Sequence, residues 1–117
     1  MIREIKQPDG VPESEFSTRF VQGMNDRMSM SYYKYGLMAE AYPHKVDAIA
    51  SLKVRLEKYE QTGNTEYLMD VGNFAMIEFE RPRHPQAYFK PEDSKSSPGR
   101  VWHGEVDRSQ RSNKGED

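Results

Sequence analysis

The sequence predicts an all-α protein: a small helical bundle built on a central antiparallel hairpin of two helices, at about residues 44–62 and 65–81. In both segments the apolar residues recur at helical spacing. Gly63 stands between them, where a helix commonly ends, and Asn64 or Thr65 can cap the helix that follows. Because the connection is so short, the two helices must run side by side in opposite directions.

Length and composition indicate one domain without covalent cross-links. The chain has 117 residues, of which 35% are hydrophobic and 31% charged, and it contains no cysteine. We expect a polar N-terminal arm at 1–12, one helical domain at 13–102 with a long C-terminal loop, and a disordered tail at 103–117. The net charge of −2, with both signs well mixed, argues against a general nucleic-acid binder. No signal peptide or apolar run long enough to cross a bilayer occurs, so we expect a cytoplasmic protein and no membrane partner.

The elements before the hairpin are also helical in pattern. A first helix is predicted to start near Ser14 and to end at Gly36, and a short helical piece at 37–42 closes at Pro43. The apolar residues that recur at helical spacing in the first helix are Phe16, Phe20, Val21, Met24 and Met28. The first hairpin helix then carries an apolar stripe of Ala48, Ile49, Leu52, Leu56 and Tyr59.

The second hairpin helix is apolar around most of its girth and carries one narrow polar stripe. At roughly 100° per residue, Glu66, Asp70 and Asn73 fall within about 60° of one another. A helix of this kind is usually buried, and an unpaired buried carboxylate is costly, so these side chains need partners. A Mg²⁺ ion held by Glu66 and Asp70 is one possibility, and a ligand is another. Alternatively, Glu66 favours the helix dipole and Asp70 pairs with an arginine or tyrosine of a neighbouring helix.

Two further clusters suggest ligand contacts. Tyr33 and Tyr35 can stack on a nucleobase or form a protein interface, although tyrosines at such positions are commonly half-buried core. The segment SKSSPGR at 94–100 can cradle a phosphate through its serines, its glycine and Arg100, or it is a plain solvated loop. Arg81 stands close enough in sequence to join such an anion site.

The run EYLMDVGNFAMIEF resembles the last core helix of the MazG-like all-α nucleotide pyrophosphohydrolases. It is more similar still to the small phage-type proteins grouped as nucleotide-modification-associated. The residues that carry the resemblance are Leu68, Asp70, Asn73, Phe74 and Ala75. The preceding KYG, the helix ending in YEQTGN and the segment SSPGR resemble small proteins of phages and their actinobacterial hosts. In the hydrolases an earlier helix adds glutamates spaced three apart as metal ligands. We expect no such pair upstream of this run, which argues against metal-assisted hydrolysis.

The function that these observations predict is that of a small phage-type protein that binds a nucleotide or nucleotide-like phosphate ligand without strong catalysis. Such a protein would handle nucleotide pools or a signalling nucleotide. The polar stripe would form hydrogen bonds with the polar edge of the ligand or hold Mg²⁺. The tyrosines would stack on the base, and an arginine would bind the phosphate. The predicted ligand-binding residues are Glu66, Asp70, Asn73, Tyr33, Tyr35, Arg81 and Arg100.

Two alternatives stay open. One is an inhibitor that binds a host protein and has no small ligand; the other is a divergent Mg²⁺-dependent nucleotide pyrophosphohydrolase. We also expect a homodimer, because a helix that is apolar on nearly every side is hard to bury in so small a monomer.

Overall fold

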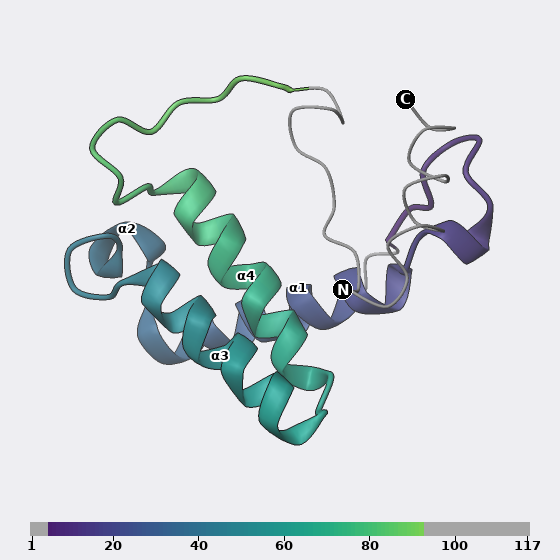
Figure 1. Ribbon diagram of the computed structural model, residues 1–117, viewed down its shortest axis with the longest axis horizontal. Helices are drawn as coiled ribbons and strands as arrows, with labels where there is room; N and C mark the ends of the chain where they lie inside the picture. The colour runs from purple at the N-terminus through teal and green to yellow at the C-terminus, as the bar shows by residue number, and fades with distance from the viewer. Residues whose placement is uncertain (1–4, 93–117) are drawn as a thin grey trace, which may run out of the picture. The chain divides into compact units, whose positions relative to one another are not determined.

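The structure is a computed structural model, which describes residues 5–92 of the chain. These residues contain four α-helices and one short 3-10 helix (Figure 1). In chain order they are the 3-10 helix Glu13–Glu15, α1 (Thr18–Tyr35), α2 (Met38–Ala41), α3 (Ala48–Thr62) and α4 (Glu66–Glu80). No strand occurs within residues 5–92, which confirms the predicted all-α class. None of these helices is both long enough and apolar enough to traverse a lipid bilayer.

The chain divides into two compact units, Met1–Ala87 and Tyr88–Asp117. The four α-helices lie in the first unit. In the second unit, the described residues 88–92 form no regular secondary structure. The division falls within the segment 13–102 that the sequence suggested as one domain, and the predicted tail at 103–117 lies outside the described residues.

Helix α1 begins later than the sequence pattern suggested. The prediction of a start near Ser14 is wrong, because that residue belongs to the separate 3-10 helix and the chain is extended at Phe16. The helix starts after Ser17, whose Oγ accepts a hydrogen bond from the backbone N–H of Phe20 at 3.0 Å. It ends at Gly36, as predicted.

The hairpin of α3 and α4 is confirmed, with a corrected start. Helix α3 begins at Ala48 and not at residue 44, because the Asp47 side chain accepts a hydrogen bond from the N–H of Ala50 at 3.0 Å and so caps the helix there. The residues before Asp47 form turns.

The turn of the hairpin uses the residues that the sequence singled out. Gly63 has a φ of 76°, a left-handed conformation that suits glycine, and its N–H donates to the carbonyl of Tyr59 at 2.7 Å. The Asn64 side chain accepts a hydrogen bond from the N–H of Glu66 at 3.0 Å and satisfies a free donor at the start of α4. Local signals of this kind explain why the hairpin can be predicted from sequence.

Helix α4 packs against both α1 and α3. Its contact with α1 is close because each helix supplies a glycine where the other supplies a methionine: Met69 lies against Gly23, and Met24 lies against Gly72. A Cβ atom on Gly72 would lie only 2.9 Å from the sulfur of Met24. The absence of side chains at the two glycines therefore lets the helices approach.

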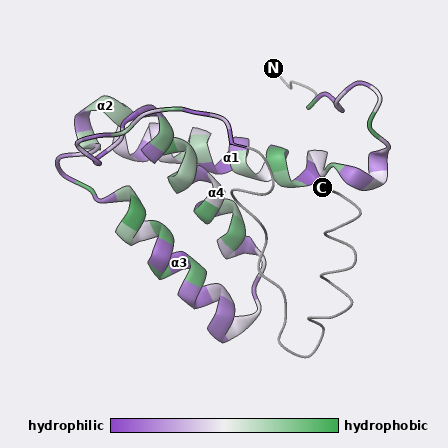
Figure 2. Cartoon of the chain, turned by 45° about the horizontal axis from the view of Figure 1, so that its top comes forward, coloured by the Kyte–Doolittle hydropathy of each residue, from purple (hydrophilic) through white to green (hydrophobic). Residues whose placement is uncertain are grey.

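In the single chain α4 is buried only in part, and burial of its remaining apolar surface by a second copy stays a prediction. Only Asn73 and Ile77 are buried in this helix, whereas Ala75, Met76 and Phe79 are exposed. Hydrophobic residues predominate along α4, while α3 mixes hydrophobic and hydrophilic residues (Figure 2). Two neighbouring helices cover only one side of α4, and the covered side includes the polar stripe.

Substituting Gly72 by leucine should destabilise the fold by roughly 1–3 kcal/mol, because the new side chain would displace Met24 and separate α1 from α4. The matched control is Glu80→Leu, which adds a leucine to the same helix at an exposed position. Urea unfolding followed by circular dichroism measures both. Equal stability of the two variants would contradict the close packing of α1 on α4.

Candidate functional site

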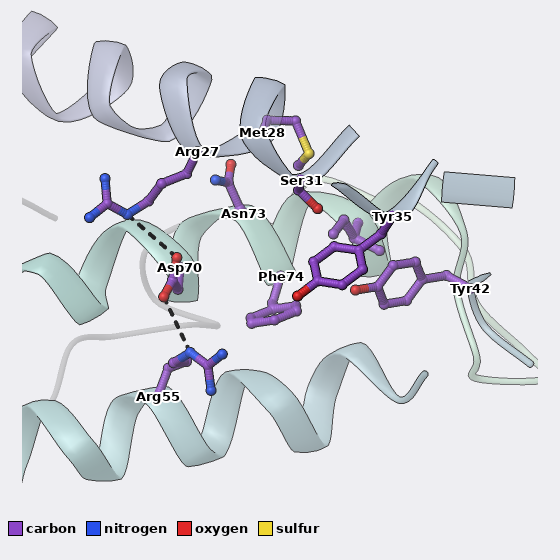
Figure 3. Close-up of a pocket in the computed structure, with 10 residues that line it drawn as sticks. Arg27, Met28, Ser31, Tyr35, Tyr42, Arg55, Asp70, Asn73 and Phe74 are labelled. Carbon is purple, nitrogen blue, oxygen red and sulfur yellow. Dashed lines mark hydrogen bonds and ion pairs between the residues drawn. The ribbon is translucent and has the colours of Figure 1, made fainter. Parts of the chain in front are cut away.

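The carboxylate of Asp70 on α4 lies between two arginines from the neighbouring helices (Figure 3). One oxygen is 3.6 Å from Nε of Arg27 on α1, and the other accepts a hydrogen bond from Nε of Arg55 on α3 at 3.2 Å. Arg27 also forms an ion pair with Glu66. The alternative in which Asp70 pairs with an arginine of a neighbouring helix is thus confirmed.

The third residue of the polar stripe, Asn73, is buried between α4 and α1. Its Nδ2 donates a hydrogen bond to the backbone carbonyl of Met24 at 3.0 Å. Its Oδ1 is buried and has no hydrogen-bond partner within the described residues. Asn73 therefore fixes the separation of the two helices beside the ion pairs.

A small cavity of about 210 Å³ opens next to these charges, and we call it the donor hollow (Figure 3). Most of its polar side chains are hydrogen-bond donors that come from three parts of the chain: Arg27, Ser31 and Tyr35 on α1, Tyr42 after α2, and Arg55 on α3. The residues that line the donor hollow are Arg27, Met28, Ser31, Tyr35, Tyr42, Arg55, Asp70, Asn73, Phe74 and Ile77.

The aromatic residues of the donor hollow lie close to its cations. The guanidinium carbon of Arg55 is 5.7 Å from the centre of the Phe74 ring. The hydroxyl groups of Tyr35 and Tyr42 point toward Phe74 (Figure 3). Burial raises the pKa of Tyr42 above its ordinary value of 10.0, and the positive charge of Arg55 partly offsets this rise. Tyr42 therefore keeps its proton at neutral pH and can donate a hydrogen bond.

A larger cavity of about 560 Å³ shares the aromatic walls of the donor hollow, and we call it the apolar hollow. The two have Ser31, Tyr35, Tyr42, Arg55 and Phe74 in common, together with Met28 and Ile77. The residues that line only the apolar hollow are Tyr32, Gly36, Leu37, Met38, Ala41, Lys45, Val46 and Ser51. A polar, donor-rich end thus adjoins a wider and mostly apolar end.

The structure brings three of the predicted site residues to this place and leaves the others outside it. Asp70, Asn73 and Tyr35 line the donor hollow. Tyr33 is 85% exposed and lines neither hollow, and Arg81 is likewise exposed outside them. Glu66 pairs with Arg27 and is not a lining residue. The segment 94–100, with Arg100, lies outside the described residues.

Sequence reasoning missed Arg27 and Arg55, although a signal for each was present. Arg55 interrupts an apolar series at helical spacing, between Leu52 and Tyr59 on α3. Arg27 stands in the same way within the methionine-rich face of α1. A cation at a core-facing position needs an anionic partner, and the polar stripe of α4 supplied the matching acids. Ser31, Tyr42 and Lys45 gave no comparable signal.

The described residues do not fit a Mg²⁺ centre. No group of three acidic or histidine side chains lies close enough together among residues 5–92 to hold a metal ion. Glu66 and Asp70 instead have arginine partners. The expectation that no glutamate pair spaced three apart lies upstream of α4 is wrong, because Glu57 and Glu60 on α3 form one. Both residues are exposed, and neither lines the donor hollow.

Comparisons with protein-family models, with curated proteins and with solved structures found no match for this chain. The resemblance to MazG-like and nucleotide-modification-associated proteins therefore stays a prediction. Function has to be inferred from the two hollows and from the charges beside them.

Replacing Asp70 by asparagine should lower the free energy of unfolding by about 1 kcal/mol, because half-buried ion pairs contribute modestly and two arginines would lose their shared counter-ion. In an Arg55→Gln background the same replacement should cost less, since the two residues interact directly. A double-mutant cycle from urea unfolding measures this coupling. A coupling energy of zero would contradict the ion pair.

Proposed function

We propose that this protein binds a nucleotide or nucleotide-like phosphate compound in the two hollows, without strong catalysis. One observation carries the proposal: a donor-rich hollow adjoins an apolar one, and aromatic walls are common to both. A nucleotide likewise has a polar end and an apolar end: an anionic phosphate at one end and a flat aromatic base at the other.

The donor hollow suits the phosphate. Guanidinium groups and hydroxyls are the side-chain donors that most often meet phosphate oxygens. Arg55 uses its Nε on Asp70, so the two terminal amino groups of its guanidinium remain to meet an anion. Ser31, Tyr35 and Tyr42 add hydroxyl donors around the same space.

The apolar hollow suits the base. Its volume of about 560 Å³ lies within the range of roughly 300–1,000 Å³ that is typical of small-molecule pockets. Tyr35, Tyr42 and Phe74 offer aromatic surface on which a base can stack, and Leu37 and Met38 extend the apolar wall. The binding of such a ring would remove this surface from water.

Binding is better supported than turnover. Hydrolysis of a phosphoanhydride with metal assistance needs a cluster of carboxylates, and the described residues offer none. Asp70 is engaged by two arginines and does not stand free as a general base. The alternative of a divergent Mg²⁺-dependent pyrophosphohydrolase therefore has less support than a binding protein.

The second candidate function is the inhibitor of a host protein, and the exposed end of α1 favours it. Tyr32 and Tyr33 pack edge to face there with ring centres 5.3 Å apart, and both remain exposed. Met30 and Leu37 add exposed apolar surface nearby in sequence. Exposed aromatic residues of this kind are common anchors in protein interfaces.

The cellular setting follows from the resemblance. A small phage-type protein of the cytoplasm that holds a nucleotide without consuming it can manage nucleotide pools or sequester a signalling nucleotide of the host. Both roles need affinity and selectivity rather than catalytic groups, which agrees with the residues of the donor hollow.

Replacing Tyr35 by leucine should weaken nucleotide binding by about tenfold or more, since loss of base stacking costs roughly 1–3 kcal/mol. Tyr33→Leu is the matched control, because this tyrosine is on the same helix but outside both hollows. Thermal shift with a panel of nucleotides and cyclic nucleotides, followed by calorimetry, measures the effect. The proposal fails if no nucleotide stabilises the protein, or if both variants lose binding equally.

Self-association remains a prediction. We expect a homodimer, because Ala75 and Met76 of α4 are exposed in the single chain and a second copy would cover such an apolar surface. Light scattering of the purified protein at micromolar concentration tests this. A mass of 13.6 kDa, that of one chain, would show that the expectation is wrong.

A further inference from the structure

The charges around the donor hollow are already balanced within the protein. Arg27 and Arg55 bring two positive charges, and Asp70 and Glu66 bring two negative charges that pair with them. Lys45, which lines the apolar hollow, adds one positive charge that has no ion-pair partner among the described residues. Because Lys45 lies at the apolar end, the donor hollow, where the proposed function places the phosphate, has no uncompensated positive charge of its own from the described residues.

This balance sets the charge of the anion that fits best. A single negative charge on the phosphate can be met by the guanidinium groups and hydroxyl donors that line the donor hollow. A second negative charge gains little net attraction, because Asp70 faces the same space, and it still has to lose its hydration on entry. No carboxylate cluster of the described residues could bring Mg²⁺ to neutralise further phosphate charges.

We infer that the site selects a ligand whose phosphate carries a single negative charge, that is, a phosphodiester such as a 3′,5′-cyclic nucleotide, over nucleoside 5′-phosphates. The inference rests on the proposed function and narrows its ligand class. Asp70 sets this selectivity: it occupies the arginines, holds them in place and repels a dianion. It is a positioning and specificity residue that makes no bond to the phosphate.

The first test compares ligands on the unaltered full chain. Calorimetry at about pH 7.5 without divalent cations would measure each 3′,5′-cyclic nucleotide against the 5′-monophosphate and 5′-triphosphate of the same base, with the monophosphate as a dianion. We expect the best cyclic nucleotide to bind about tenfold or more tightly than its 5′-phosphates, as a loss of charge complementarity predicts. If 5′-phosphates bind as well or better, the inference is overturned while the proposed function stands. If no nucleotide binds, both fail.

The second test removes the negative charge of Asp70. In Asp70→Asn the 5′-monophosphate should gain affinity, and the preference for the cyclic form should shrink by about tenfold. Glu80→Gln is the matched control, because Glu80 is an exposed acid on the same helix that lines neither hollow. If Asp70 had only a structural role, Asp70→Asn would lower the affinity for both ligands by the same factor. An unchanged ratio of the two affinities would overturn the inference.

The third test needs no substitution and so holds even if Asp70→Asn does not fold. The second pKa of a phosphate monoester is about 6, so at about pH 5.5 most of the 5′-monophosphate is a monoanion, whereas the cyclic diester is a monoanion throughout. The charged and titratable groups that line the two hollows are Arg27, Arg55, Lys45, Asp70, Tyr32, Tyr35 and Tyr42. In the wild-type protein, the ratio of the affinity for the cyclic nucleotide to the affinity for the 5′-monophosphate should therefore be smaller at about pH 5.5 than at about pH 7.5. A preference that stays the same at both pH values would overturn the inference.

Discussion

The ion pairs of Asp70 with Arg27 and Arg55 are the interaction on which the arrangement of the helices depends. They join α4 to α1 on one side and to α3 on the other. The donor hollow lies beside the shared carboxylate, and both arginines line it. The same contact thus links the three helices and contributes charged groups to the cavity. Its half-buried position keeps the charges accessible to a ligand.

The sequence predicted what depends on local chemistry and missed what depends on the neighbours of a helix. The hairpin could be predicted because Gly63 and Asn64 act within a few residues of their own positions. The periodicity of α4 identified its polar stripe, but it could not tell how many helices would cover the remaining faces, and Ala75, Met76 and Phe79 are exposed in the single chain. The partners of Asp70 lie on two other helices, so the sequence left open a metal, a ligand or a protein group.

Few of the described residues are buried: only Ala48, Asn73 and Ile77 belong to this group, and none of the three is completely removed from solvent. Stability must therefore come mainly from half-buried contacts, such as the methionines packed on glycines and the ion pairs of Asp70. A fold with so small a core responds strongly to anything that binds its native state, because binding energy adds directly to the free energy of unfolding. The occupied and empty forms of the hollows should differ clearly in their resistance to proteolysis.

The packing of Met24 and Met69 on opposing glycines also makes the protein sensitive to oxidants. Conversion of either thioether to a sulfoxide adds a polar oxygen to a side chain that lies against a glycine of the facing helix. The added atom would push α1 away from α4 and carry Arg27 away from Asp70. Oxidative damage at a helix contact would in this way reach the donor hollow, although neither methionine lines it. Methionine sulfoxide reductases, which restore the thioether, would then also restore the site.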